Sequence, residues 1–218
     1  LPMGLRKQIV ERAAIVSFRD ERSAEPFRSM PHVRVAPCPS INALSSFVRE
    51  EALSYTNGNT LLHVRHDTMV PAADQEPRCI AERALAQFAR TQGLRVRTIN
   101  NYKRFPLSAY WTMRYVRRHY ASTGLVFTGR LHGMIIAACL GKPVVAFSRD
   151  RKIEAVAKTL GLADWVLDYG EAGSVGKLLR ATSAFPYERV SSTVMQQCVL
   201  NEQYATKVKE FLYSSRYA

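Results

Sequence analysis

The amino-acid sequence predicts an α/β fold with a largely parallel sheet. Short apolar runs alternate along the chain with longer segments of helical period, and residues 124–147 repeat the order strand, helix, strand. Such alternation is typical of parallel strands joined by helical crossovers. The chain has 218 residues, of which 47% are hydrophobic, so it can bury one large core or two small ones.

The first elements are short. Residues 8–27 predict a helix, an apolar run that ends at Phe18, and a second helix capped by Ser23. Residues 32–44 predict a strand followed by a proline-rich loop. Residues 61–64 are a compact apolar run and predict a buried strand.

An amphipathic helix and an edge strand follow. In residues 79–92 the apolar side chains recur at helical spacing, and Gly93 ends the pattern. The positions on one face are Ile80, Ala84, Leu85 and Phe88. Residues 94–99 alternate between apolar and basic side chains, which predicts a half-buried or edge strand.

The clearest pattern is in residues 124–147. It predicts a strand at 125–127, a helix at 132–140 that ends at Gly141, and a strand at 144–147. This helix is apolar at nearly every position, so it must be covered on most sides, with its N-terminus facing a cleft. Further along, the sequence predicts helices at 150–161, 174–182 and 194–213 and a strand at 165–168.

The net charge of the chain indicates which chemical classes of partner it could bind. The formal net charge is +13, from 31 Lys and Arg against 18 Asp and Glu, so an anionic partner is expected: a phosphorylated small molecule, an acidic polysaccharide, nucleic acid or a membrane surface. No uncharged apolar run is long enough for a membrane span.

The four cysteines lack metal-ligand spacing, which predicts reduced thiols and no metal. We expect a cytoplasmic protein; an anchor preceding Leu1 would instead place it in a secretory lumen.

Polar clusters directly follow two predicted strands. Arg65, His66 and Asp67 follow the first, and the sequence Arg130-Leu131-His132-Gly133 follows the second. Ligands of open parallel sheets bind outside the carboxyl ends of the strands, and a helix N-terminus there attracts anions. A purely structural role is the alternative: Arg130 would be a surface residue, and His132 would cap the helix.

The segment from Val126 to Leu162, with its R-L-H-G turn, resembles the polysaccharide pyruvyl transferase family. Three further segments are similar to family motifs in the same order: LPMGL at the start of the chain, SFRDERSAEPFR, whose R-D-x-x-S is Arg19 to Ser23, and LLHVRHD at residues 61–67. The resemblance covers about residues 1–170.

The resemblance implies a GT-B-like fold that transfers a pyruvyl group from phosphoenolpyruvate to sugar hydroxyls of a glycan or polysaccharide. Residues 1–50 would be a remnant of the N-terminal lobe, and residues 51–190 the Rossmann-like C-terminal catalytic lobe with its parallel sheet. Residues 191–218 would form a helix that packs back on the fold. Phosphoenolpyruvate is the donor substrate, so the resemblance implies no cofactor and no metal.

Family positions imply roles for several side chains. His132 matches the general acid that protonates the donor, and histidine changes charge near neutral pH. Arg65 and Arg130, with Leu131 and Gly133, match the donor pocket, where a carboxylate and a phosphate require arginines. Asp150 and Lys152 match a D-x-K segment; Asp150 as a helix N-cap is the alternative. His66 and Asp67 could relay protons or be structural.

Two features depart from the family pattern. Family members are longer and contain a Rossmann-like N-terminal half, most of which has no counterpart in these residues. Ser40 stands where the family commonly has Asp, in a P-D pair. The acceptor site and the general base therefore stay unassigned.

Three other functions remain open. The basic and aromatic residues 110–120 suit nucleic acid, but Trp111, Tyr115 and Val116 also form an ordinary buried stripe. Because no nucleic-acid-binding motif is present, no nucleic-acid partner is expected. A relative without catalysis, and a glycosyltransferase that uses a nucleotide sugar, would share the fold.

Overall fold

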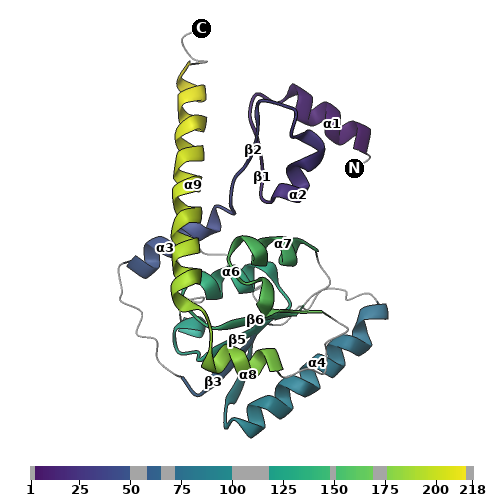
Figure 1. Ribbon diagram of the computed structural model, residues 1–218, viewed down its shortest axis with the longest axis vertical. Coiled ribbons are helices and arrows are strands. Elements are labelled where there is room, and N and C mark those ends of the chain that lie inside the picture. The colour runs from purple at the N-terminus through teal and green to yellow at the C-terminus, as the bar shows by residue number, and fades with distance from the viewer. Residues whose placement is uncertain are drawn as a thin grey trace.

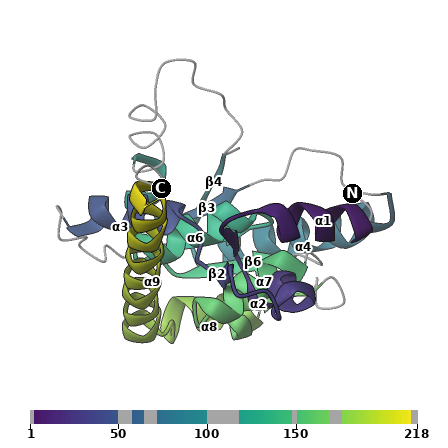
Figure 2. The same cartoon turned by 90° about the horizontal axis from the view of Figure 1, so that it is seen from above.

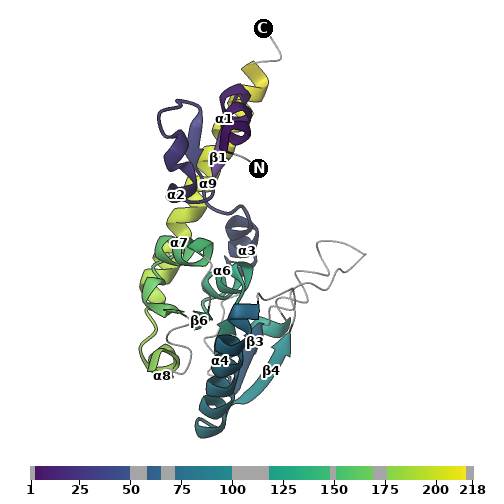
Figure 3. The ribbon, with the colours of Figure 1, turned by 90° about the vertical axis from the view of Figure 1, so that its right-hand side faces the viewer.

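The computed structural model describes residues 3–49, 58–64, 72–99, 118–147, 151–168 and 176–214. Within them lie two sheets, one of five strands and one of two, and each has its own cluster of buried apolar side chains. Helices of the larger unit separate its sheet from the smaller unit, as Figures 1 and 3 show.

The five-stranded sheet is parallel throughout, in the order β4-β3-β5-β6-β7. Its strands are β3 (Thr60–Val64), β4 (Arg95–Ile99), β5 (Leu125–Thr128), β6 (Val144–Phe147) and β7 (Val166–Leu167). Every residue of β5 and β6 is buried, because helices cover both faces of a sheet whose strands are joined by crossovers. The sequence therefore predicted the parallel sheet and the edge position of residues 94–99 correctly.

Helices lie on both faces of this sheet (Figure 1). On one side are α6 (Leu131–Cys139) and α7 (Arg151–Thr159), and on the other are α4 (Ala72–Thr91) and α8 (Gly176–Ser183). Right-handed crossovers require this arrangement, because the chain moves across the sheet in opposite directions before and after β4. In α6, all residues from Gly133 to Cys139 are buried, as the apolar pattern predicted.

The smaller unit consists of α1 (Met3–Arg12), β1 (Val16–Phe18), α2 (Glu21–Ala24), the 3-10 turn η1 (Glu25–Phe27) and β2 (Val33–Val35). The two strands are parallel, and Val10, Ala24, Phe27 and Val33 form the core between them and the helices. The N-cap of α2 is Asp20, whose carboxylate accepts hydrogen bonds from the Ser23 amide and hydroxyl at 2.8 and 2.9 Å. The prediction that Ser23 is the cap was wrong, since Ser23 is the residue that the cap binds.

The connection from the smaller unit to the sheet contains a helix that the sequence reasoning missed. Residues after Pro39 form α3 (Ser40–Arg49), where a proline-rich loop was predicted. Proline is tolerated at a helix start because its missing N–H would have no partner there. Ile41 and Leu44 of α3 belong to the main core.

The C-terminal helix α9 (Tyr187–Ser214) starts seven residues earlier than predicted and packs against α3 and α6. Its buried residues are Val190, Val194, Gln197 and Cys198, all in its first half. The second half extends beyond the sheet unit, and the view from above separates it from α1 (Figures 1 and 2). None of the helices within the described ranges combines the length and the apolar character that crossing a bilayer demands.

Candidate functional site

The R-L-H-G sequence forms the turn between β5 and α6. Arg130 is the N-cap residue of α6, with the extended dihedral angles φ −121° and ψ 134°. The Arg130 amide donates to Thr128 Oγ1 at 3.0 Å, and the Met134 amide donates to the Arg130 carbonyl at 3.2 Å. These two bonds hold the turn at both ends. Arg130, and not His132, is therefore the capping position of the helix.

Gly133 lets α6 approach the sheet closely. A Cβ atom at this position would lie 2.3 Å from Thr128 Oγ1 and 3.4 Å from Val64 Cγ1. Thr128 and Val64 are the last residues of β5 and β3, and they pair directly in the sheet. Only glycine fits such a contact, so Gly133 places the first turn of α6 over the carboxyl ends of both strands.

This turn lies where the direction of the sheet reverses. The chain leaves β3 for β4 on one side and returns to β5 on the other side. Ligands of doubly wound sheets bind outside the carboxyl ends of the strands at such a reversal. The backbone amides of the first turn of α6 have no partner within the helix, which makes them available to an anion.

The side chains of the turn point in different directions. Leu131 is partly buried and packs against the main core, whereas His132 is exposed and Arg130 is half-buried. The turn therefore presents an imidazole at the same point where the helix presents its amides. A positive helix end next to a proton donor suits chemistry on an anionic substrate.

His132 contacts the thiol of Cys38, which precedes α3. The hydrogen bond from His132 is the main cause that lowers the pKa of Cys38 from 9.0 to about 7; burial opposes it, and Ser40 assists. The Cys38 Sγ and Ser40 Oγ atoms are 3.0 Å apart. Cys38 is only 9% exposed, so its contact with His132 is largely shielded from water.

Two asparagines fix the position of Cys38. Asn201 of α9 donates to the Cys38 carbonyl at 3.3 Å and to the Asn42 Oδ1 at 2.7 Å. Asn42 in turn donates to the Cys198 carbonyl at 3.1 Å. Because these bonds cross between α3 and α9, the C-terminal helix holds the segment that faces His132.

We expect the titration of Cys38 to depend on His132. The absorbance near 240 nm of the parent minus that of Cys38→Ser should show thiolate formation with a midpoint near pH 7, and His132→Gln should raise this midpoint. Because folding lowers the pKa, the ionised thiol stabilises the fold fully above pH 9, progressively less below it, and not at all below pH 7. A midpoint near 9 in the parent would contradict the contact.

One comparison with known proteins identifies the family. The family model described as polysaccharide pyruvyl transferase matches residues 3–151, which is more than half of the chain and includes the R-L-H-G turn. The chain belongs to the polysaccharide pyruvyl transferase family. The family is one of transferases that act on polysaccharides, as its name states. Neither the curated proteins nor the solved structures include a match to this chain.

The structure places only some of the predicted site residues of this pyruvyl transferase family member. Arg130, Leu131, His132 and Gly133 come together at one turn, as described. Arg65, His66, Asp67 and Asp150 lie outside the described residues, so their roles stay predictions. Lys152 lies on the first turn of α7, is exposed, and lines a cavity shared with the smaller unit.

Sequence reasoning missed Cys38, the partner of His132. Cys38 is far from His132 in the sequence, and its neighbours Pro37 and Pro39 indicated a loop with no chemistry. The signal that could have found it is the absence of the family's aspartate, because Ser40 and Cys38 occupy that segment. Among the described parts of the chain, no group of three or more His, Cys, Asp or Glu side chains could hold a metal ion.

Proposed function

We propose that this chain transfers the pyruvyl group of phosphoenolpyruvate to hydroxyl groups of a glycan. The observation that supports it best is the position of the R-L-H-G turn. In a member of the polysaccharide pyruvyl transferase family, this turn lies at the carboxyl ends of β3 and β5, where the sheet reverses. We further propose that the five-stranded unit is the Rossmann-like C-terminal lobe of a GT-B-like fold, and the smaller unit part of the N-terminal lobe.

The donor would bind through its two anionic groups. Arg130 and the amides at the start of α6 supply positive charge to one of them, and Arg65 is the proposed partner of the other. Holding both groups fixes the enol carbon C2 and the methylene carbon C3 relative to His132. A single arginine would leave the donor free to rotate, which is why two anchors are proposed.

His132 would act as the general acid. It donates a proton to C3, the carbon–carbon double bond supplies the electron pair for the new C–H bond, and C2 becomes electrophilic. A sugar hydroxyl adds to C2 and loses its proton, and the C2–O bond to phosphate then breaks with its electrons leaving on phosphate. Addition of a second hydroxyl would complete a cyclic ketal.

Cys38 would keep the His132 ring oriented. The hydrogen bond that lowers the pKa of the Cys38 thiol also fixes the orientation of the imidazole that would donate the proton. Cys38 is a positioning residue in this proposal, because it acts through His132. Cys38→Ser should therefore lower kcat, because the imidazole is less well oriented, and leave the KM for phosphoenolpyruvate nearly unchanged.

Transfer in heavy water tests the proposal. With phosphoenolpyruvate and a panel of oligosaccharide acceptors in D₂O, inorganic phosphate should appear in step with product, and each pyruvyl methyl group should contain one deuterium. Arg130→Ala should slow both, since it removes a donor anchor. Product without deuterium would contradict protonation at C3, and glycan modification that requires a nucleotide sugar would favour a glycosyltransferase instead.

A further inference from the structure

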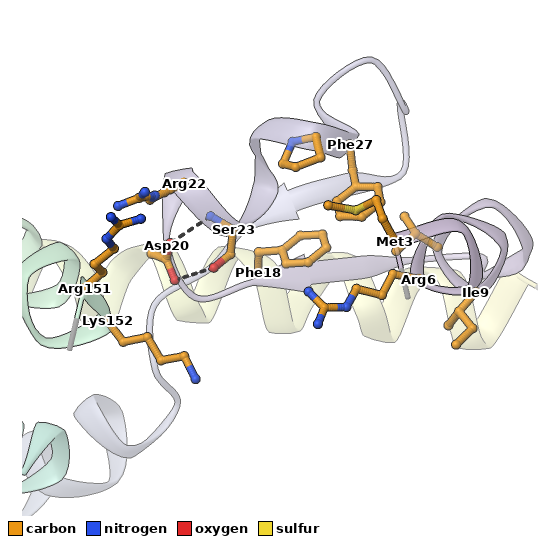
Figure 4. Close-up of a pocket in the computed structure, with 12 residues that line it drawn as sticks. Met3, Arg6, Ile9, Phe18, Asp20, Arg22, Ser23, Phe27, Arg151 and Lys152 are labelled. Atoms are coloured by element: carbon orange, nitrogen blue, oxygen red, sulfur yellow. Dashed lines mark hydrogen bonds between the residues drawn. The ribbon is translucent and has the colours of Figure 1, made fainter. Parts of the chain in front are cut away.

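A cavity lies between the smaller unit and the start of α7. Its volume is about 560 Å³, within the range of small-molecule sites. Its walls come from α1, β1, α2, η1 and the first turn of α7 (Figure 4). Arg130, Leu131, His132 and Gly133 are not among its lining residues, so it is distinct from the R-L-H-G turn.

Four cationic side chains line this cavity: Arg6 from α1, Arg22 from α2, and Arg151 and Lys152 from α7. Figure 4 shows Arg22 and Arg151 together at the α7 end of the cavity, although they come from different units. Like charges repel, so such a convergence costs free energy unless an anion lies between them.

The arginines of the cavity have no carboxylate partners within the described ranges. Arg6, Arg22 and Arg151 make no hydrogen bond or ion pair to another described residue. Other cations of the same unit do have partners: Lys7 pairs with Glu11, and Arg28 pairs with both Glu21 and Glu25. The charge is therefore unbalanced at the cavity and not throughout the unit.

Among the described lining residues, the one carboxylate is already engaged. Asp20 is 8% exposed, and its two oxygens accept the bonds from the Ser23 amide and hydroxyl. It therefore caps α2, and no ion pair joins it to Arg6, Arg22 or Arg151. The cavity thus keeps an excess of positive charge that suits a phosphate or a carboxylate.

Away from Arg22 and Arg151 the described lining is largely apolar, and Arg6 is the one charged residue there. Phe18 and Phe27 stack with ring centroids 5.2 Å apart and nearly parallel planes, so each covers one face of the other. The rest of this wall is Met3, Ile9, Val10 and Pro26. An apolar wall of this kind suits the C–H face of a sugar ring.

We propose that this cavity binds an anionic sugar unit, a ring whose C–H face lies on the apolar wall and whose phosphate or carboxylate lies between Arg22 and Arg151. The inference deepens the proposed function, since it makes the acceptor an acidic glycan held by the smaller unit. It stands on the cavity, the unpaired arginines and the apolar wall, and none of these includes Arg130 or His132.

Binding to the full chain, measured by calorimetry at fixed ionic strength, tests the proposal. The probes are glucose 1-phosphate, glucuronic acid, glucose, inorganic phosphate and AMP. At least one acidic sugar should bind about tenfold more tightly than glucose or inorganic phosphate, and the difference between the first two probes tells which anion is preferred. Inorganic phosphate that binds equally well, or AMP that binds more tightly, would overturn the assignment to a sugar.

Matched variants locate the site. Arg22→Gln with Arg151→Gln should weaken binding of the acidic sugar at least tenfold. Arg12→Gln and Lys158→Gln remove the same charge from the last turns of α1 and α7, away from the cavity, and should leave binding unchanged. Equal losses in both sets would mean that net charge alone attracts the sugar, which overturns the proposal.

Failure of this site and failure of the proposed function are distinguishable. Phosphoenolpyruvate binding and its loss in Arg130→Ala report on the donor site only. If the acidic sugar binds and phosphoenolpyruvate does not, the cavity assignment holds and the pyruvyl transfer proposal fails. If phosphoenolpyruvate binds and no acidic sugar does, the cavity assignment is wrong.

Discussion

Replacing His132 by Gln should lower kcat for pyruvyl transfer by about 10²–10⁴-fold, the usual contribution of general acid catalysis. Glutamine keeps a polar side chain at the start of α6 but has no proton to give to C3. The Kd for phosphoenolpyruvate should change little, because Arg130 and the helix amides remain. The measurement is single-turnover phosphate release, together with donor binding by calorimetry.

A second histidine provides the control. His32 Nε2 lies 2.7 Å from the Val10 carbonyl in the smaller unit, and a glutamine amide can donate to the same oxygen. His32→Gln should therefore keep kcat within about twofold, since the changed group touches no substrate. If His132→Gln retains kcat and the donor still binds, His132 is not the acid and the mechanism is wrong.

Replacing Gly133 by Ala should destabilise the protein by about 1–3 kcal/mol, the usual cost of overpacking a close contact. The new Cβ would lie 2.3 Å from Thr128 Oγ1 and 3.1 Å from Thr128 Cβ, so α6 would have to move away from the ends of the strands. Because the same movement displaces the R-L-H-G turn, donor binding should weaken as well. Thermal unfolding with and without phosphoenolpyruvate measures both effects.

A double substitution shows whether that contact is the cause. Thr128→Ala alone should cost about 1 kcal/mol, because the Arg130 amide loses the hydroxyl that accepts its hydrogen bond. Thr128→Ala with Gly133→Ala should cost less than the sum of the two. Gly4→Ala is the matched control, since it is a helical glycine with nothing within 4 Å of the added Cβ, and it should be neutral or stabilising. Additive costs would contradict the contact.

Local pattern was enough to predict the β5-α6-β6 unit. Strands buried on both faces are apolar throughout, and glycine marks the end of α6, so both features appear directly in the sequence. The edge strand β4 was predicted from its alternation for the same reason. The family resemblance stated from the R-L-H-G segment is confirmed by the match over residues 3–151.

The features that the sequence did not predict depend on contacts between distant residues or are exceptions to local rules. Helix α4 begins at Ala72, before Pro77, a residue that ends most helical patterns. The partner of His132 is Cys38, which precedes α3, and Cys38 in turn contacts Ser40 of α3 and Asn201 of α9; no local period brings these residues together. The cationic cavity likewise joins α1 and α2 to α7, and only the fold brings these elements together.

The measurement that tests the central claim most directly is thermal unfolding of the full chain with and without phosphoenolpyruvate, on the parent and on Arg130→Ala. At about 100 times its Kd, the donor should add roughly 2.7 kcal/mol to the free energy of unfolding of the parent, a shift of several degrees. Arg130→Ala should lose this shift, while Arg118→Ala, which removes an exposed cation before β5, should keep it. A parent that phosphoenolpyruvate does not stabilise would contradict the assignment of the R-L-H-G turn as a donor site.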